Sequence, residues 1–147
     1  MKEAYGGILN IFFIAVFLVI ISSILAFIVT YTKAFRMKNA IISTVEQYEG
    51  SGCMEKGTSC YNRIVSKARE IHYNVSSNKL TCEADYTNVN DMYCIKENKN
   101  TGMRTMSYKI VTQVDFYFPI LSDIFSFNIF KVSGETQQIE IPEYYND

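Results

Sequence analysis

The residues of this chain whose chemistry depends most on spacing are its four cysteines. An even number of cysteines in a small domain is typical of disulfides formed in an oxidising compartment. Spacing alone leaves three pairings open, and the short loops favour Cys53 with Cys60 and Cys82 with Cys94. Zinc is the alternative, but neither pair has the separation of about two to four residues found in ribbon and finger sites. We therefore expect two disulfides, and neither a metal nor a cofactor.

Catalytic chemistry has little to build on in this sequence. The single histidine, His72, falls near the end of an expected helix and has no identifiable acid or base partner. Glycine-rich phosphate loops and the HExxH, GxSxG and CxxC motifs are absent from the sequence. We therefore expect a protein that is not an enzyme. The run Asn74-Val75-Ser76 fits a glycosylation acceptor, a common pattern that indicates exposure at most.

The charged residues are balanced and dispersed along the chain. Fourteen Lys and Arg stand against fifteen Asp and Glu, which gives a net charge of -1. Nucleic-acid-binding proteins concentrate positive charge in order to neutralise phosphates. We therefore expect no nucleic-acid partner.

The N-terminal segment has the composition of a membrane anchor. No charged residue occurs from Ala4 through Thr32, and an apolar run continues from Ile8 to Val29. A bilayer core is crossed by about 20 such residues in a helix, so membrane lipid is an expected partner. A cleaved signal peptide is the alternative, but its apolar stretch is shorter, about 7 to 15 residues.

Helical periodicity continues beyond this apolar run. Apolar residues recur at helical spacing among charged ones, and the first stop signal is Gly50-Ser51-Gly52. We favour one continuous helix over a separate juxtamembrane helix. The expected organisation is a transmembrane and spacer helix over residues 1–49 and a head domain over residues 50–147. The apolar positions of the spacer are Ala34, Met37, Ile41, Val45 and Tyr48.

The head has the pattern of an α+β domain with an antiparallel sheet. A short amphipathic helix is expected from Tyr61 to His72. Strands are expected over Lys79–Ala84, Asp91–Lys96, Thr105–Phe118, Phe127–Val132 and Thr136–Ile141. The expected connections are a turn over Asp85–Asn90, a hairpin loop over Glu97–Gly102 and a turn or bulge over Ser133–Glu135.

The strand from Thr105 gives the clearest alternation of apolar and polar residues. One face of such a strand is buried, and the spacer half of the first helix is the apolar surface available to cover it. We therefore expect a shared head core that contains Tyr108, Ile110, Val114, Phe116 and Phe118.

Two rules disagree about the side of the membrane on which the head lies. Lys33, Arg36 and Lys38 follow the apolar run, and by charge counting they would place the head in the cytoplasm. The cysteines indicate an oxidising compartment instead. Because only a few residues precede the span, we give the cysteines more weight and expect the head to lie outside the cytoplasm.

The architecture resembles that of type IV pilins and pseudopilins, and more narrowly that of TadE-like pilus proteins. The residues behind the resemblance are the helix from Ala4 to Glu49, the run Val114 to Leu121 with Pro119, and the segment Ile129 to Thr136. Those families share a processing site followed by Glu at the fifth mature position. Gly6-Gly7 could serve as such a site, but Phe12 occupies the fifth position after it. The sequence is therefore compatible with a pilin-like protein that is not cleaved.

The resemblance implies a structural subunit of a surface filament or of a secretion or pilus assembly, with other copies or other pilus and secretion proteins as partners. Small residues allow helices to approach closely. We therefore expect Ala15, Ser22 and Ala26 to contribute to a helix assembly interface. The alternative is a membrane-anchored accessory protein of a secretion, conjugation or viral entry complex whose head binds a partner.

Overall fold

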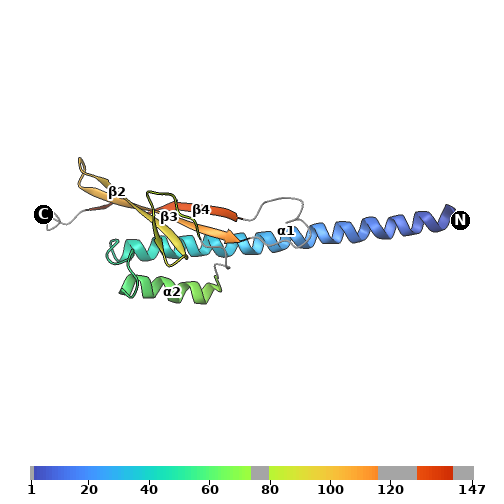
Figure 1. Cartoon of the computed structure of the whole chain (residues 1–147), viewed down its shortest axis with the longest axis horizontal. Helices are drawn as coiled ribbons and strands as arrows, with labels where there is room; N and C mark the ends of the chain where they lie inside the picture. The colour runs from blue at the N-terminus through green and yellow to red at the C-terminus, as the bar shows by residue number, and fades with distance from the viewer. Residues whose placement is uncertain (1, 74–79, 116–128, 141–147) are drawn as a thin grey trace.

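The structure is a computed structural model that describes residues 2–73, 80–115 and 129–140. One helix, α1 (Lys2–Gln47), extends along most of the molecule, and a compact head packs against its C-terminal part (Figure 1). At 1.5 Å per residue, its 46 residues span about 69 Å. The helix is unbroken, as expected, because neither Pro nor Gly occurs from Ile8 to Gln47.

The C-terminal part of α1 is amphipathic, and its apolar side enters the core. The side chains of Ala34, Met37, Ile41 and Val45 recur every three or four residues, and all four are buried. The helix ends where Glu49 and Gly50 adopt positive φ angles of 50° and 76°. The Gly50 N–H then donates to the Val45 carbonyl at 2.8 Å, a bond typical of helix ends that have a left-handed residue.

The second helix, α2 (Ser59–Ile71), packs alongside α1. Thr58 caps its N-terminus by accepting a hydrogen bond from the Tyr61 N–H at 3.3 Å. Cys60, Ile64 and Ala68 form its buried side, and His72 ends it in a left-handed conformation. In Figure 1, α1 lies between α2 and the sheet.

The sheet is antiparallel, with strand order β1-β2-β3-β4, and a short β5 also pairs with β3. The α+β fold expected from the sequence is therefore confirmed. Tyr108, Ile110 and Thr112 alternate along β3, and all three are buried on the side of α1. The Thr112 hydroxyl reaches the Ala34 carbonyl at 3.4 Å. The strands are β1 (Thr87–Val89), β2 (Tyr93–Asn100), β3 (Thr105–Asp115), β4 (Ile129–Glu135) and β5 (Ile139–Glu140).

The strand expected over Lys79–Ala84 is wrong for its described part, which forms no strand. Its Leu80 carbonyl accepts from the side chain of Asn88 at 3.1 Å, and Cys82 is bonded to Cys94, so neither contact is a ladder bond between strands. The turn expected over Asp85–Asn90 instead contains β1. The chain reverses at Asn90 and Asp91, whose φ angles of 54° and 56° suit a tight hairpin turn.

Two other boundaries also differ from expectation. The β2–β3 loop is confined to residues 101–104, because β2 continues to Asn100 opposite Thr105. This hairpin projects beyond the end of α1 (Figure 1), so its polar residues meet solvent and show no alternation. The break expected over Ser133–Glu135 lies instead at residues 136–138, between β4 and β5.

Gly134 lies inside β4 opposite Ile110, not in a turn. A Cβ atom at this position would lie 2.7 Å from Cδ1 of Ile42 and 2.9 Å from Cδ of Lys38. A glycine in a strand often marks such a close approach. Gly134 therefore allows β4 to lie directly on α1.

Candidate functional site

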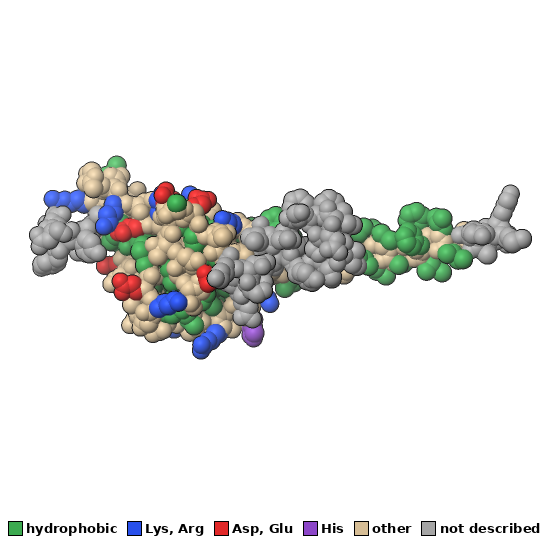
Figure 2. All heavy atoms as spheres, in the orientation of Figure 1, with side chains coloured by type: hydrophobic (Ala, Val, Ile, Leu, Met, Phe, Trp, Pro, Cys, Tyr) green, Lys and Arg blue, Asp and Glu red, His purple; other side chains and the backbone are tan. Residues whose placement is uncertain are grey.

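The N-terminal half of α1 presents an apolar surface that the described part of the head does not cover, and part of it is seen in green toward the N-terminus in Figure 2. Ile8 and Ile11 are 67% and 70% exposed, and most large side chains from there to Val29 are also exposed. Exposed apolar area costs about 25 cal/mol per Å² relative to burial. This segment is long and apolar enough to cross a membrane, and it fits a transmembrane helix.

The serine and threonine hydroxyls in and next to this segment form hydrogen bonds within the helix itself. Ser22 donates to the Val19 carbonyl at 2.9 Å, and Ser23 bonds to the same carbonyl. Thr30 and Thr32 donate to carbonyls four residues earlier, at 2.9 and 2.7 Å. An unsatisfied polar group in a bilayer costs several kcal/mol. These hydroxyls can therefore enter an apolar environment without that cost.

The three small residues expected at an assembly interface fall on one side of this helix. At 3.6 residues per turn, Ala15, Ser22 and Ala26 lie within about 40° of one another around the axis. All three are exposed. The structure therefore brings them together on one narrow strip, which no described residue of the head covers.

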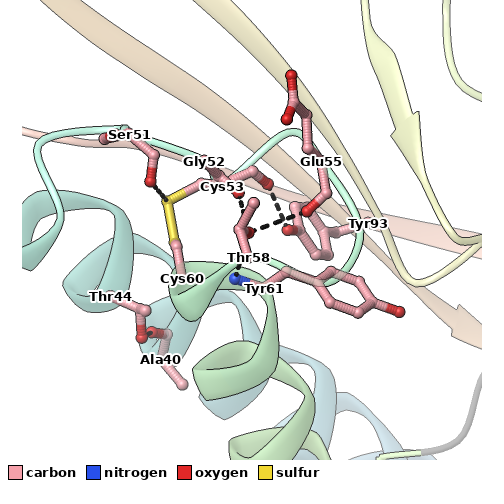
Figure 3. The surroundings of a disulfide bond; sticks show 10 residues. All are labelled: Ala40, Thr44, Ser51, Gly52, Cys53, Glu55, Thr58, Cys60, Tyr61 and Tyr93. Carbon is pink, nitrogen blue, oxygen red and sulfur yellow. Dashed lines mark hydrogen bonds between the residues drawn. A yellow bond between two sulfur atoms is a disulfide. The ribbon is translucent and has the colours of Figure 1, made fainter.

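The loop between the two helices is held by several independent contacts (Figure 3). Cys53 and Cys60 form a disulfide and are both buried. The Thr58 hydroxyl lies within hydrogen-bonding distance of the Gly52 and Glu55 carbonyls. The Tyr93 hydroxyl, from β2, donates to the Cys53 carbonyl at 2.7 Å. This bond ties the loop to the sheet, and burial raises the pKa of Tyr93 above its ordinary value.

The second disulfide joins Cys82 to Cys94 over a Cα–Cα distance of 5.7 Å. Cys94 lies in β2 and is buried, so the bond fastens the stretch before β1 to the sheet. Both disulfides thus join the partners that the short loops favour. Their presence suggests a head that folds in an oxidising compartment.

An open pocket of about 630 Å³ lies at the end of the head farthest from the exposed apolar segment. Carboxylates are contributed to it by Glu49, Glu55 and Glu97. The Nζ atom of Lys99 lies 3.5 Å from Oε1 of Glu97. Aromatic rings and carboxylates together suit a positively charged group. The other lining residues are Tyr48, Gly50, Ser51, Gly52, Met54, Met106 and Tyr108.

Only some of the other residues expected to matter from the sequence lie in the part of the chain that the structure describes. Tyr108 and Ile110 are buried in the core shared with α1, as expected. The side chain of Val114 and the whole of Phe116 and Phe118 lie outside the described residues, as does the Asn74-Val75-Ser76 run. His72 is exposed at the end of α2, and the described ranges contain no cluster of three metal-ligating side chains.

Sequence reasoning missed the contacts that depend on tertiary geometry. The Tyr93 bond to the loop joins residues 40 positions apart, and no pattern in the sequence indicates it. The distal pocket is built from three separate segments, so no motif marks it either. Gly134 did carry a signal, since an isolated glycine in a strand pattern indicates a bulge or a close approach.

Comparisons with protein-family models, curated proteins and solved structures find no match to this chain. The structure itself defines the class: an α+β protein whose long N-terminal helix fits a transmembrane helix and whose head carries two disulfides.

Proposed function

We propose that this chain is a structural, pilin-like subunit of a surface filament or of a secretion or pilus assembly, with its head outside the cytoplasm. The observation that carries the proposal is the division of α1 into two environments. Its C-terminal part is buried under the sheet, whereas its N-terminal half is apolar and exposed. Such a half helix can be covered by lipid in the membrane and by the helices of other copies after assembly.

The strip formed by Ala15, Ser22 and Ala26 is the surface at which another helix could approach most closely. Small side chains allow backbones to come near one another, and dispersion contacts then replace those with lipid. The satisfied hydroxyl of Ser22 adds no desolvation cost to this contact. In an assembled form, we therefore place a neighbouring helix on this strip.

The test replaces Ala15, Ser22 and Ala26 together by leucine. A matched control replaces Ile20, Ile24 and Ile28 by leucine. These residues lie on the opposite face of the helix, and the exchange leaves the side-chain volume there unchanged. Both variants should insert into membranes normally. Only the first should lose high-molecular-weight assemblies and filaments in electron micrographs of sheared surface material. Assembly unchanged in both variants would contradict the proposal.

The distal pocket favours a second candidate function, that of a membrane-anchored accessory protein whose head binds a partner. Its three carboxylates and two tyrosines would suit a lysine or arginine side chain of that partner. A lysine-rich peptide should then bind the intact protein in detergent more weakly as salt increases. Replacing Glu49, Glu55 and Glu97 by glutamine should reduce binding, whereas glutamine at the exposed Glu83 and Glu140 should not.

A further inference from the structure

One end of the head lies level with the end of the apolar segment of α1. The ring of Phe130, at the start of β4, meets the ring of Phe27 edge to face, with 5.5 Å between centroids. Phe27 belongs to the charge-free stretch of α1. Counted from Ile8 at 1.5 Å per residue, about 30 Å of helix ends near Phe27, which matches the thickness of a bilayer core. The sheet therefore begins where the hydrocarbon would end.

Two other elements of the head end at the same level. β3 ends at Asp115, and its Val114 lies opposite Phe130 of β4. Tyr73, which follows α2, donates from its hydroxyl to the Gln113 carbonyl at 2.8 Å and so joins the end of α2 to the end of β3. The head thus presents one end toward the apolar segment, and we call it the proximal end (Figure 1).

The proximal end combines exposed aromatic rings with positive charge. Phe27 stacks on Tyr31 at 6.1 Å, and Tyr31 and Phe130 are 44% and 37% exposed. Lys33, Arg36 and Lys38 are the only charged residues of α1 between Ala4 and Val45. The last turn of α2 contributes Arg69, and Lys131 follows Phe130 in β4. The neighbouring Glu70 carboxylate is paired with Lys67 at 2.7 Å.

Tyr at the edge of an apolar span, followed by Lys and Arg, is a pattern that anchors proteins in the interfacial layer of a bilayer, and the rings of Phe27 and Phe130 pack beside Tyr31 at this edge. We propose that the proximal end of the head is itself seated in this layer. Phe27, Tyr31 and Phe130 lie at the depth of the lipid carbonyl groups. Lys33, Arg36 and Lys131 reach outward to the lipid phosphates, since long cationic side chains can extend toward polar headgroups.

The absence of tryptophan from the chain makes this depth directly measurable. Phe130→Trp and, separately, Tyr31→Trp each give the full-length protein one indole reporter after reconstitution in phosphatidylcholine vesicles. Met103→Trp is the matched control, because Met103 is 69% exposed at the distal β2–β3 hairpin. Tyr31 lies on the helix surface, so its variant still reports if the change at Phe130 disturbs β4.

Both proximal indoles should emit at shorter wavelength than the Met103→Trp control. They should also be quenched more strongly by lipids brominated near the glycerol backbone than by lipids brominated near the chain ends. The proposal would be overturned if the proximal indoles emitted at the wavelength of the control and were quenched by aqueous acrylamide to the same extent. Indoles shielded from acrylamide and from both brominated lipids would overturn it too, and would indicate a neighbouring copy at this end.

Discussion

Replacing Gly50 with alanine should destabilise the head much more than the same change at Gly57. Gly50 adopts a φ of 76°, and a Cβ atom there would lie 2.0 Å from the hydroxyl oxygen of Tyr108 and 2.1 Å from its Cζ. Gly57 adopts a φ of 85°, but a Cβ atom there would meet nothing within 4 Å. Gly57 therefore isolates the backbone cost from the steric one.

The two contributions can be estimated separately. A left-handed conformation costs an alanine about 1 to 2 kcal/mol. Forcing a buried ring out of a packed position adds about 1 to 3 kcal/mol. We expect Gly57→Ala to lower the free energy of unfolding by the first amount alone. Gly50→Ala should lower it by about 2 to 5 kcal/mol.

The assay is urea unfolding of the full-length protein in detergent micelles, followed by the near-ultraviolet circular dichroism of the tyrosines. A Tyr108→Leu background removes the ring that the new methyl group would strike. In that background, Gly50→Ala should cost no more than Gly57→Ala does. Equal costs for the two glycine variants in the wild-type background would refute the steric reasoning.

Three other predictions concern the stability of the head. Ile110→Ala, at a fully buried position, should lower the free energy of unfolding by about 2 to 5 kcal/mol, and Lys109→Ala on the exposed face should change it little in the same urea titration. Tyr93→Phe should cost about 1 kcal/mol through the lost bond to the Cys53 carbonyl. Because burial raises the pKa of Tyr93 above its ordinary 10.0, its neutral form should stabilise the head fully below about pH 10, and this contribution should decline as the pH rises further. Unfolding titrations in which wild type and Tyr93→Phe lose stability equally above pH 10 would contradict this. Replacing both Cys53 and Cys60 by serine should cost about 2 to 3 kcal/mol, and non-reducing peptide mapping that finds four free thiols in the unmodified chain would contradict both disulfides.

The elements with strong periodicity could be predicted from the sequence. Ala34, Met37, Ile41 and Val45 repeat at helical spacing, and their side chains are buried as that pattern requires. Tyr108 and Ile110 follow the alternation of a half-buried strand in the same way. In both cases one side of the element faces a core along its length, so apolar residues recur in the sequence at the spacing of that buried side.

The parts that were predicted wrongly lack such a regular repeat of apolar residues. Leu80 is buried in a stretch that is held by a side-chain hydrogen bond and a disulfide, and local propensity cannot distinguish this stretch from a strand. The end of β2 near Asn100 projects into solvent, where the strand has no buried face to impose alternation. The distal pocket and the ring contact between Phe27 and Phe130 bring together segments far apart in the chain, and a single sequence does not encode those distances in any local pattern.

The unbroken course of α1 has a mechanical consequence. With neither proline nor glycine between Ile8 and Gln47, the helix offers no hinge between its apolar half and the half bound to the sheet. Gln47 lies sixteen residues beyond Tyr31, or about 24 Å along the axis. If the helix tilts as one rod by about 20°, a common angle in bilayers, Gln47 moves sideways by about 8 Å. A tilt of the apolar half is therefore transmitted to the head without loss. A change of bilayer thickness or of helix neighbours that alters this tilt would displace the distal face of the head sideways.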